Sequence, residues 1–228
     1  GEATWTSSDE AVATVSPEGI VTAIGEGTAT ITATAGEKTA TCTITVSISI
    51  VDIEGNQATF HLDGASAAQV SQAISEAAQA GVTRFILTGD SEALGLYDGN
   101  PFSGIQIELL NLSGVTGWQD RDADGLPELP AESFRHTGSS DFSGLQEVIL
   151  PQEIQQLQDY AFYKCTNLTK ITAPGVVRVN SFAFQSCTKL AEVSMPEVTY
   201  LGTNAFMSTA LQVADFPKLQ TLEGSVFW

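Results

Sequence analysis

The first fifty residues alternate with a period of two between small or β-branched apolar residues and polar residues. The alternation is strict over 28–34 and 41–46, and turn-forming segments interrupt the pattern at 17–19, 25–27 and 36–37. Short β-branched runs between Gly- or Pro-containing turns predict antiparallel strands. This part of the chain is therefore expected to form a piece of a β-sandwich.

The pattern changes between 52 and 110. A strand-like run precedes Ser66 and Gln69, which have the Ser-x-x-Gln spacing of a helix capping box. Apolar residues then follow at helical spacing as far as Gly81, which is placed to end a helix. One amphipathic helix is predicted over 66–80, with strand-like runs before and after it.

From 129 onward, a pair made of a small residue and Phe recurs along the chain. Phe162, Phe184 and Phe206 are 22 residues apart, Phe227 follows after 21, and Phe134 precedes by 28, which makes five copies. A unit this short cannot close its own core, so neighbouring units must stack into a solenoid that buries the repeated apolar residues. The strand-like segments of the last four copies lie at 145–150, 168–173, 190–195 and 211–216.

Composition and charge narrow the function classes. The 228 residues carry 27 acidic and only 9 basic side chains, a net charge of −18, so a basic surface for nucleic acid or anionic lipid is lacking. The apolar runs are shorter than the ~18 residues of a membrane span, and the N-terminus lacks the pattern of a signal peptide. We predict no nucleic-acid partner and no membrane insertion, and any export signal or lipid anchor would lie outside this sequence.

The N-terminal strand pattern resembles the bacterial immunoglobulin-like group 2 family, because four of its motifs occur here in the family's order. The family's first strands are missing, so we expect either a fragment or a half-sandwich that leans on its neighbour, since an uncovered apolar sheet face is unstable. The four motifs are Trp5–Asp9, Val12–Val15, Gly19–Ala23 and Gly27–Ile31.

The repeat pattern Leu-x-x-Val-x-Leu-Pro, followed by Ile-x-x-Leu-x-x-x-Ala-Phe-x-x-Cys, resembles the BspA-like leucine-rich repeat family. The expected fold is mainly β with some α. An incomplete Ig-like domain over 1–50 precedes a repeat domain over 51–228, in which 51–104 resembles an N-terminal helical cap and 105–228 holds the repeats.

The three cysteines are an odd number, which argues against a disulfide framework. Cys165 and Cys187 each follow their repeat Phe by three residues, and this repetition indicates small core residues, with a disulfide or a metal pair as the alternative. Cys42 alternates with Thr in a strand and is expected to face the core.

Candidate catalytic groups are few, because His61 and His136 are the only histidines. His136 lies near Ser139, Ser140 and Asp141, but these residues belong to a polar insertion whose loop composition explains them. The abundant carboxylates do not single out a pair. We predict no catalytic residue and a non-enzymatic protein.

One segment has the spacing of a metal loop. Asp120, Asp122, Asp124 and Gly125 reproduce positions 1, 3, 5 and 6 of a calcium loop, but position 12, where a bidentate Glu belongs, is Ala131. Two interpretations remain, a calcium loop and a solvated acidic surface loop, and the departures favour the second. No other cofactor is expected.

The exposed positions of the strand segments form columns on the open face of the predicted solenoid, the surface such proteins usually use for partners. Glu147, Lys170 and Glu192 form one column, and Thr172 and Ser194 belong to another. These five residues are the predicted binding residues.

Both resemblances imply an exported bacterial protein, extracellular or on the cell surface. The first hypothesis is a non-enzymatic adhesion or recognition protein that binds an extracellular protein. The alternative is a glycan-binding component of a surface uptake system, favoured if Tyr97, Phe102 and Trp118 cluster in one cleft. Because the chain stops at Trp228, directly after a repeat Phe, we also expect either an excised piece of a longer protein or self-association through the open end.

Overall fold

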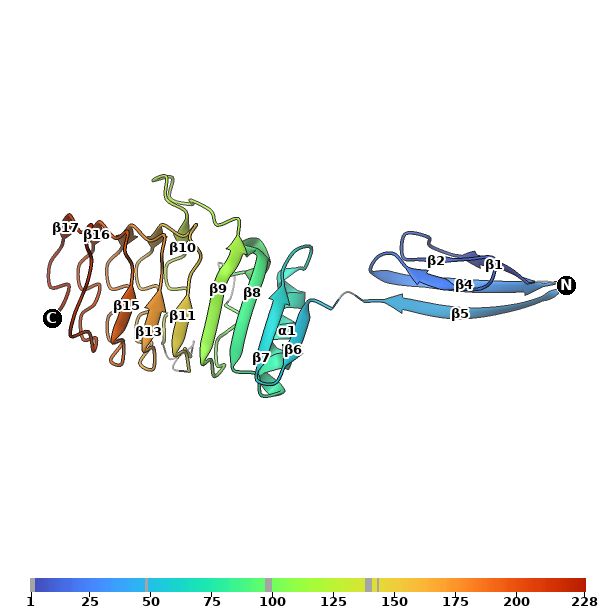
Figure 1. The fold of residues 1–228 in the computed structure, drawn as a ribbon, viewed down its shortest axis with the longest axis horizontal. Coiled ribbons are helices and arrows are strands. Elements are labelled where there is room, and N and C mark those ends of the chain that lie inside the picture. Colours follow the sequence, from blue (N-terminus) through green and yellow to red (C-terminus); the bar gives the residue numbers. More distant parts are fainter. Residues whose placement is uncertain (1–2, 48, 97–99, 138–140, 143) are drawn as a thin grey trace. The chain divides into compact units, whose positions relative to one another are not determined.

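The computed structural model describes residues 3–47, 49–96, 100–137, 141–142 and 144–228. It divides into two compact units, Gly1–Ser49 and Ile50–Trp228 (Figure 1). Strands dominate both units. Among the described residues, none of the helices has the length and apolar character that a membrane span requires.

The first unit contains two small antiparallel sheets. In one, the nine-residue strands β4 and β5 pair along their whole length and β1 joins the other side of β4; in the second, β2 pairs with β3. The predicted alternation of Thr with apolar residues thus forms paired strands. The strands are β1 (Thr4–Ser7), β2 (Ala13–Val15), β3 (Val21–Ala23), β4 (Gly27–Ala35) and β5 (Lys38–Val46).

The core of this unit is small. Its buried cluster consists of Val12, Ala13 and Ala29, with Ile44 and Val46 packed against it. The expectation that Cys42 faces the core is wrong, because its side chain is exposed. Cys42 shares a face of β5 with Ile44 and Val46, but the cluster covers only the end of the strand where those two residues lie.

The second unit is built on a seven-stranded sheet. Its order is β15-β13-β11-β9-β8-β7-β6, and every neighbouring pair is parallel except the β6–β7 hairpin. In Figure 1, the strands from β7 to β15 stand side by side in this order. They are β6 (Val51–Glu54), β7 (Gln57–His61), β8 (Arg84–Asp90), β9 (Leu109–Thr116), β11 (Glu147–Ile149), β13 (Lys170–Thr172) and β15 (Glu192–Ser194).

A second ladder of two-residue strands runs along another side of the stacked repeats. Its five strands are all parallel, and each one pairs with the same position of the next repeat, as Leu157 does with Val179. They are β10 (Glu128–Leu129), β12 (Gln156–Leu157), β14 (Arg178–Val179), β16 (Tyr200–Leu201) and β17 (Thr221–Leu222).

The predicted strand at 211–216 is wrong. These described residues form no strand, and the seven-stranded sheet ends at β15. This copy is one residue shorter than the two before it, and its Phe216 instead packs on the rings of Phe206 and Phe227. Val213 is 81% exposed as a result.

The predicted helix is present as α1 (Ala67–Gln79), and a short 3-10 helix, η1 (Ser91–Leu94), follows β8. Ser66 accepts a hydrogen bond from the Gln69 backbone while the Gln69 side chain accepts one from the Ser66 backbone, which completes the capping box. Val70 and Ile74 of α1 are fully buried in the same core as the sheet.

The repeat Phe residues form a stacked ladder through the core. Phe134, Phe162, Phe184 and Phe206 are each at most 1% exposed, and successive ring centroids lie 5.2, 5.1 and 5.0 Å apart. The residue two before each Phe turns the chain with a left-handed backbone, for example Phe182 at φ 63°. Stacking neighbours therefore bury the repeated apolar residues, as the period requires.

The cysteines of the repeats are free thiols buried beside this ladder. The Cys165 thiol donates to the Phe134 carbonyl at 2.9 Å, and the Cys187 thiol donates to the Phe162 carbonyl at 3.0 Å. Burial raises the pKa of the Cys165 thiol well above its ordinary value. Both residues therefore act as small core residues that connect successive coils.

Candidate functional site

The outward face of the seven-stranded sheet brings the predicted binding residues together. Strand register aligns one outward residue from each strand into a continuous line, which we call the outward row. The residue before each row member along the repeat strands points the other way, and two of these residues, Val148 and Ile171, are fully buried. The outward row consists of Asp52, Thr59, Ile86, Asn111, Ile149, Thr172 and Ser194.

The outward row is partly apolar at its centre and polar at its ends. Ile86, Asn111, Ile149 and Thr172 are half-buried, while Ser194 at the edge strand is exposed. Sequence analysis identified only the part of the row that the repeats supply. Its extension through β9, β8 and β7 was missed, because those strands lie outside the 22-residue period and are brought into line with the repeats by the pairing of β9 with β11.

The predicted charged column lies beside the outward row. Glu147, Lys170 and Glu192 pair in register, and the Lys170 ammonium lies 3.6 Å from the Glu147 carboxylate and 3.8 Å from the Glu192 carboxylate. The Lys170 side chain is 44% exposed, so solvent screens both contacts and each contributes about 0–1 kcal/mol. The column ends at Glu192, because the next copy forms no strand.

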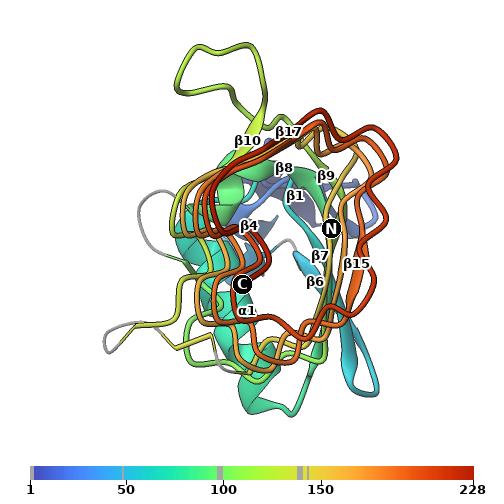
Figure 2. The same cartoon turned by 90° about the vertical axis from the view of Figure 1, so that its left-hand side faces the viewer.

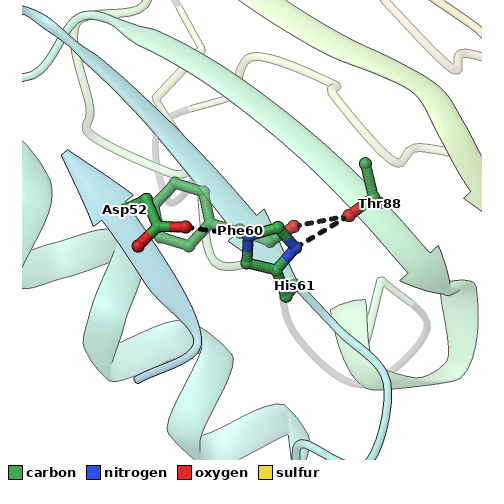
Figure 3. A network of polar contacts seen from close by, with 4 residues as sticks. All are labelled: Asp52, Phe60, His61 and Thr88. Carbon is green, nitrogen blue, oxygen red and sulfur yellow. Dashed lines mark hydrogen bonds and ion pairs between the residues drawn. The ribbon is translucent and has the colours of Figure 1, made fainter. Parts of the chain in front are cut away.

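A hydroxyl, an imidazole and a carboxylate meet at the β6 edge of the same face (Figure 3). His61 Nε2 lies 3.1 Å from Asp52 Oδ2, and His61 Nδ1 lies 3.4 Å from Thr88 Oγ1. Thr88 donates its only hydroxyl proton to the Phe60 carbonyl at 3.2 Å. A nucleophile must give its proton to the base, so this arrangement is suited to holding three strands together rather than to nucleophilic catalysis.

Of the residues considered as catalytic partners of His136, the structure describes only Asp141. His136 Nδ1 lies 3.3 Å from Asp141 Oδ1, whereas Ser139 and Ser140 lie outside the described residues.

A pocket of about 630 Å³ opens beside the start of α1. The described residues that line it include Asp90 and Glu92 but no histidine, lysine or cysteine.

Of the three aromatic residues considered for glycan binding, the two that the structure describes are buried. Phe102 is fully buried and Trp118 is 7% exposed, while Tyr97 lies outside the described residues. Phe102 instead packs edge-on against Phe85 in the core.

A partly exposed aromatic group occurs elsewhere on the repeats. The rings of Tyr160 and Phe182 stack at 4.8 Å, and the Arg135 guanidinium lies 5.1 Å from the Tyr160 ring centroid and 5.5 Å from that of Tyr163. These rings are therefore already engaged with one another and with a cation, which leaves little free face for a sugar.

The acidic loop between β9 and β10 brings its three aspartates together. Asp120, Asp122 and Asp124 each direct a carboxylate oxygen to within 4.8 Å of the others. The Gly125 amide, at φ 90°, donates to Asp120 Oδ2 at 2.8 Å. Glu132, one residue beyond position 12 of the calcium pattern, instead forms an ion pair with Arg135.

Two glutamines form hydrogen bonds with the acidic loop: Gln156 in β12, and Gln158, the first residue after β12. Gln158 Nε2 donates to Asp122 Oδ2 at 2.8 Å and to Glu128 Oε2 at 2.6 Å, and Gln156 Nε2 donates to Asp122 Oδ2 at 3.1 Å. The Gln158 hydrogen bond lowers the pKa of Asp122. Burial, reinforced by the three aspartates, raises the pKa of Glu128. Sequence reasoning missed these partners because they lie more than 30 residues from Asp122.

Comparison with protein families agrees with this architecture. Residues 128–228 match the model described as BspA type Leucine rich repeat region, in six copies, and residues 1–48 match the one described as Bacterial Ig-like domain. The chain joins a bacterial Ig-like domain to BspA-type repeats. The repeat match begins at 128 rather than at the expected 105, and it contains one copy more than the five Phe pairs.

Comparison with individual proteins adds little. The crystal structure of a leucine rich cell surface protein from Faecalibacterium prausnitzii A2-165 shares 20% identity with this chain, with a TM-score of 0.20. The alignment covers 34% of this chain and 34% of that one, so the chain spans about a third of the relative's length. No curated protein matches the chain.

Proposed function

We propose that this chain is a non-enzymatic recognition module of a cell-surface or secreted bacterial protein and that it binds a protein partner through the outward face of its seven-stranded sheet. The observation that carries this proposal is the outward row, which crosses seven paired strands without interruption. A continuous, partly exposed sheet face offers the broad flat area that a protein interface of about 800 Å² per partner requires. The BspA-type repeats support the surface setting.

The proposal includes a division of labour along the chain. The Ig-like segment at 1–50 serves as a spacer, the repeats at 105–228 form a leucine-rich repeat solenoid, and 51–104 caps its first coil. Two observations support the cap: β8 pairs in parallel with β9, the first strand of the 105–228 region, and α1 buries Ile74 in the core shared with the repeats.

The composition of the outward face favours a protein over a sugar. Ile86 and Ile149 supply apolar contact at the centre, and Lys170 with its two glutamates supplies exchangeable charges beside them. Interfaces commonly combine an apolar centre with a polar rim. Because the ion pairs of Lys170 are screened, a partner can replace either glutamate at little cost.

The test compares two threonine substitutions. Thr172→Arg places a long charged side chain in the outward row, between Ile149 and Ser194, and Thr221→Arg makes the same change on β17 of the other ladder. Both variants and the unaltered chain are applied to arrays of extracellular-matrix proteins and of glycans. We expect the unaltered chain to bind a protein ligand. The Thr172→Arg variant should bind this ligand at least about tenfold more weakly, a loss of about 1.4 kcal/mol, whereas the affinity of Thr221→Arg should be unchanged.

Two results would contradict the proposal. One is a protein ligand whose affinity Thr172→Arg leaves intact, because the outward row would then lie outside the interface. The other is binding to glycans alone, which would establish the alternative of a glycan-binding surface component.

A further inference from the structure

The seven-stranded sheet ends at β15 although the stack of coils continues past this strand. Figure 2 looks along the stack and shows β15 on one side of the coils and β17 of the other ladder on another. The next coil is present, because Leu201 of β16 pairs with Leu222 of β17. The described residues 211–216 of that coil nevertheless form no strand beside β15. The outer side of β15 is therefore left without a paired strand, and we call it the open edge.

The open edge presents backbone groups that can bond another strand. The amide of Ala173 donates to the Ser194 carbonyl at 2.9 Å, so Ser194 directs its backbone toward β13. Successive residues of a strand direct these groups to opposite sides, so the N–H and C=O of Val193 face the open edge. Among the described residues, β15 has β13 as its one paired neighbour. Such an edge is a template for strand addition.

The segment that follows this coil past the open edge is weakly held. Residues 212–215 are exposed, and only Leu211 and Phe216 at the two ends pack against the core. Val213 is 81% exposed. Moving 212–215 aside therefore uncovers little apolar surface, and an incoming strand can displace these residues.

The core side of the open edge lacks an apolar neighbour. Val148 and Ile171 are fully buried between strands, whereas Val193 at the same position of β15 is only partly buried. Ala214, the corresponding residue of the last copy, is exposed. A Val or Ile placed beside Val193 would cover it on the outer side, as Ile171 does on the inner side.

The outward side of the open edge favours a basic residue. Lys170 lies 3.6 Å from the Glu147 carboxylate on one side and 3.8 Å from the Glu192 carboxylate on the other. The Glu192 side chain is 71% exposed and lies at the end of this column. Val213, at the corresponding position of the last copy, carries no charge. A Lys or Arg on the outer side of Glu192 would continue the alternation of charge.

We propose that the open edge binds an extended segment of the protein partner, which joins the sheet as a parallel strand. Its pattern is a basic residue beside Glu192, Val or Ile beside Val193, and Ser or Thr beside Ser194. The inference rests on the proposed function, because it names how the partner of the outward face is held. In strand addition, backbone hydrogen bonds supply affinity and alternate side chains supply specificity.

The probe is a labelled synthetic peptide that copies residues 168–173 and is blocked at both ends. It offers Lys170, Ile171 and Thr172 in the proposed pattern, and in the chain these residues pair in parallel with β15 from the inner side. Fluorescence anisotropy should give a dissociation constant at or below about 1 mM for the unaltered chain. Hydrogen exchange of the Val193 amide should slow when the peptide binds.

Val193→Pro tests the backbone contact. Proline removes the outward N–H, and an edge strand tolerates it where the N–H faces solvent. Val193→Ala is the matched control, because it shortens the side chain and keeps the N–H. The proline variant should bind the peptide at least about tenfold more weakly than the alanine variant. Circular dichroism checks that both are folded, and if Val193→Pro is not, the charge reversal at Glu192 decides.

Glu192→Lys tests the charge contact and should weaken peptide binding about threefold to tenfold. A peptide with Lys170→Glu should regain the lost affinity for this variant, because the two charges are then exchanged. Glu54→Lys makes the same reversal on β6, the opposite edge strand of the sheet, and should bind the original peptide as the unaltered chain does.

Absence of binding at about 1 mM chain, equal losses in Val193→Pro and Val193→Ala, or an equal loss in Glu54→Lys overturns the inference. Dimers of the unaltered chain that Glu192→Lys separates also overturn it, because a second copy would then occupy the open edge. If the peptide does not bind while Thr172→Arg still weakens the protein ligand, the inference fails and the proposed function stands.

Discussion

At the scale of single residues, the repeat Phe positions are the part of the molecule that local sequence determines best. Phe162, Phe184 and Phe206 are one period apart, and the structure buries all three and stacks them at 5.1 and 5.0 Å. Parallel offset rings at this distance add to the free energy of burial. Phe227 stacks less closely, at 5.8 Å from Phe206 and 6.4 Å from Phe216, and is 47% exposed.

Phe184→Ala should lower the free energy of unfolding by about 3–5 kcal/mol, because it removes a buried ring between two others and leaves a cavity. The measurement is chemical denaturation followed by tryptophan fluorescence. Phe227→Ala is the matched control, and its half-exposed ring should cost clearly less. Equal losses in the two variants, or an unchanged midpoint for Phe184→Ala, would show that the stacked ladder does not contribute as described.

The cysteines show where residue-scale reasoning succeeds and where it fails. Cys165 and Cys187 are buried as the repeat predicted, because each position has a stacked coil on its inner side. Cys42 was expected in the core because it alternates with Thr in a strand, but it is exposed. Alternation identifies a face of a strand, whereas burial depends on whether another element covers that face.

At the scale of elements, α1 was predicted in place because its signals are local. The capping box at Ser66 and the apolar spacing of Val70, Ala73 and Ile74 lie within one short segment. The strand expected at 211–216 failed for the opposite reason. A strand of this sheet exists only where the neighbouring coil meets it in register, and this shortened copy does not.

Ser66→Ala should reduce the free energy of unfolding by about 1 kcal/mol, because the amide of Gln69 at the start of α1 loses its acceptor. Thermal denaturation monitored by circular dichroism measures the change. Ser71→Ala in the exposed part of the same helix is the control and should be neutral or slightly stabilising, since Ala favours helix. If the free energy of unfolding of Ser66→Ala equals that of the unaltered chain, packing alone stabilises the start of the helix.

At the scale of the whole molecule, the two units differ in how much apolar surface they bury. The first has a buried cluster of Val12, Ala13 and Ala29, whereas the second has one continuous core from Ala58 to Val226. Local stability follows the density of buried apolar contacts. The Ig-like unit should therefore open far more readily than the repeat unit.

Hydrogen exchange measures this difference directly. The amides of β4 and β5 should exchange at least about tenfold faster than those of β8 and β9, which are paired strands of similar length on a large core. Rates are corrected for the intrinsic exchange of each sequence. Equal protection of the two strand pairs would contradict the inference and indicate that the small unit is stabilised by something other than its own core.

The sequence by itself determined the repeat period, the Phe ladder, the capped helix and the strands of the Ig-like unit, because each is encoded within a few residues or repeated at fixed spacing. The tertiary structure decided the rest. It joined β7, β8 and β9 to the repeats in one outward row, and it placed Gln156 beneath Asp122 although 34 residues separate them. These contacts depend on how strands outside the period align and on where the chain returns after a loop. Strand register and coil stacking become fixed only when the common core forms, and they then bring together side chains whose relation no local pattern records.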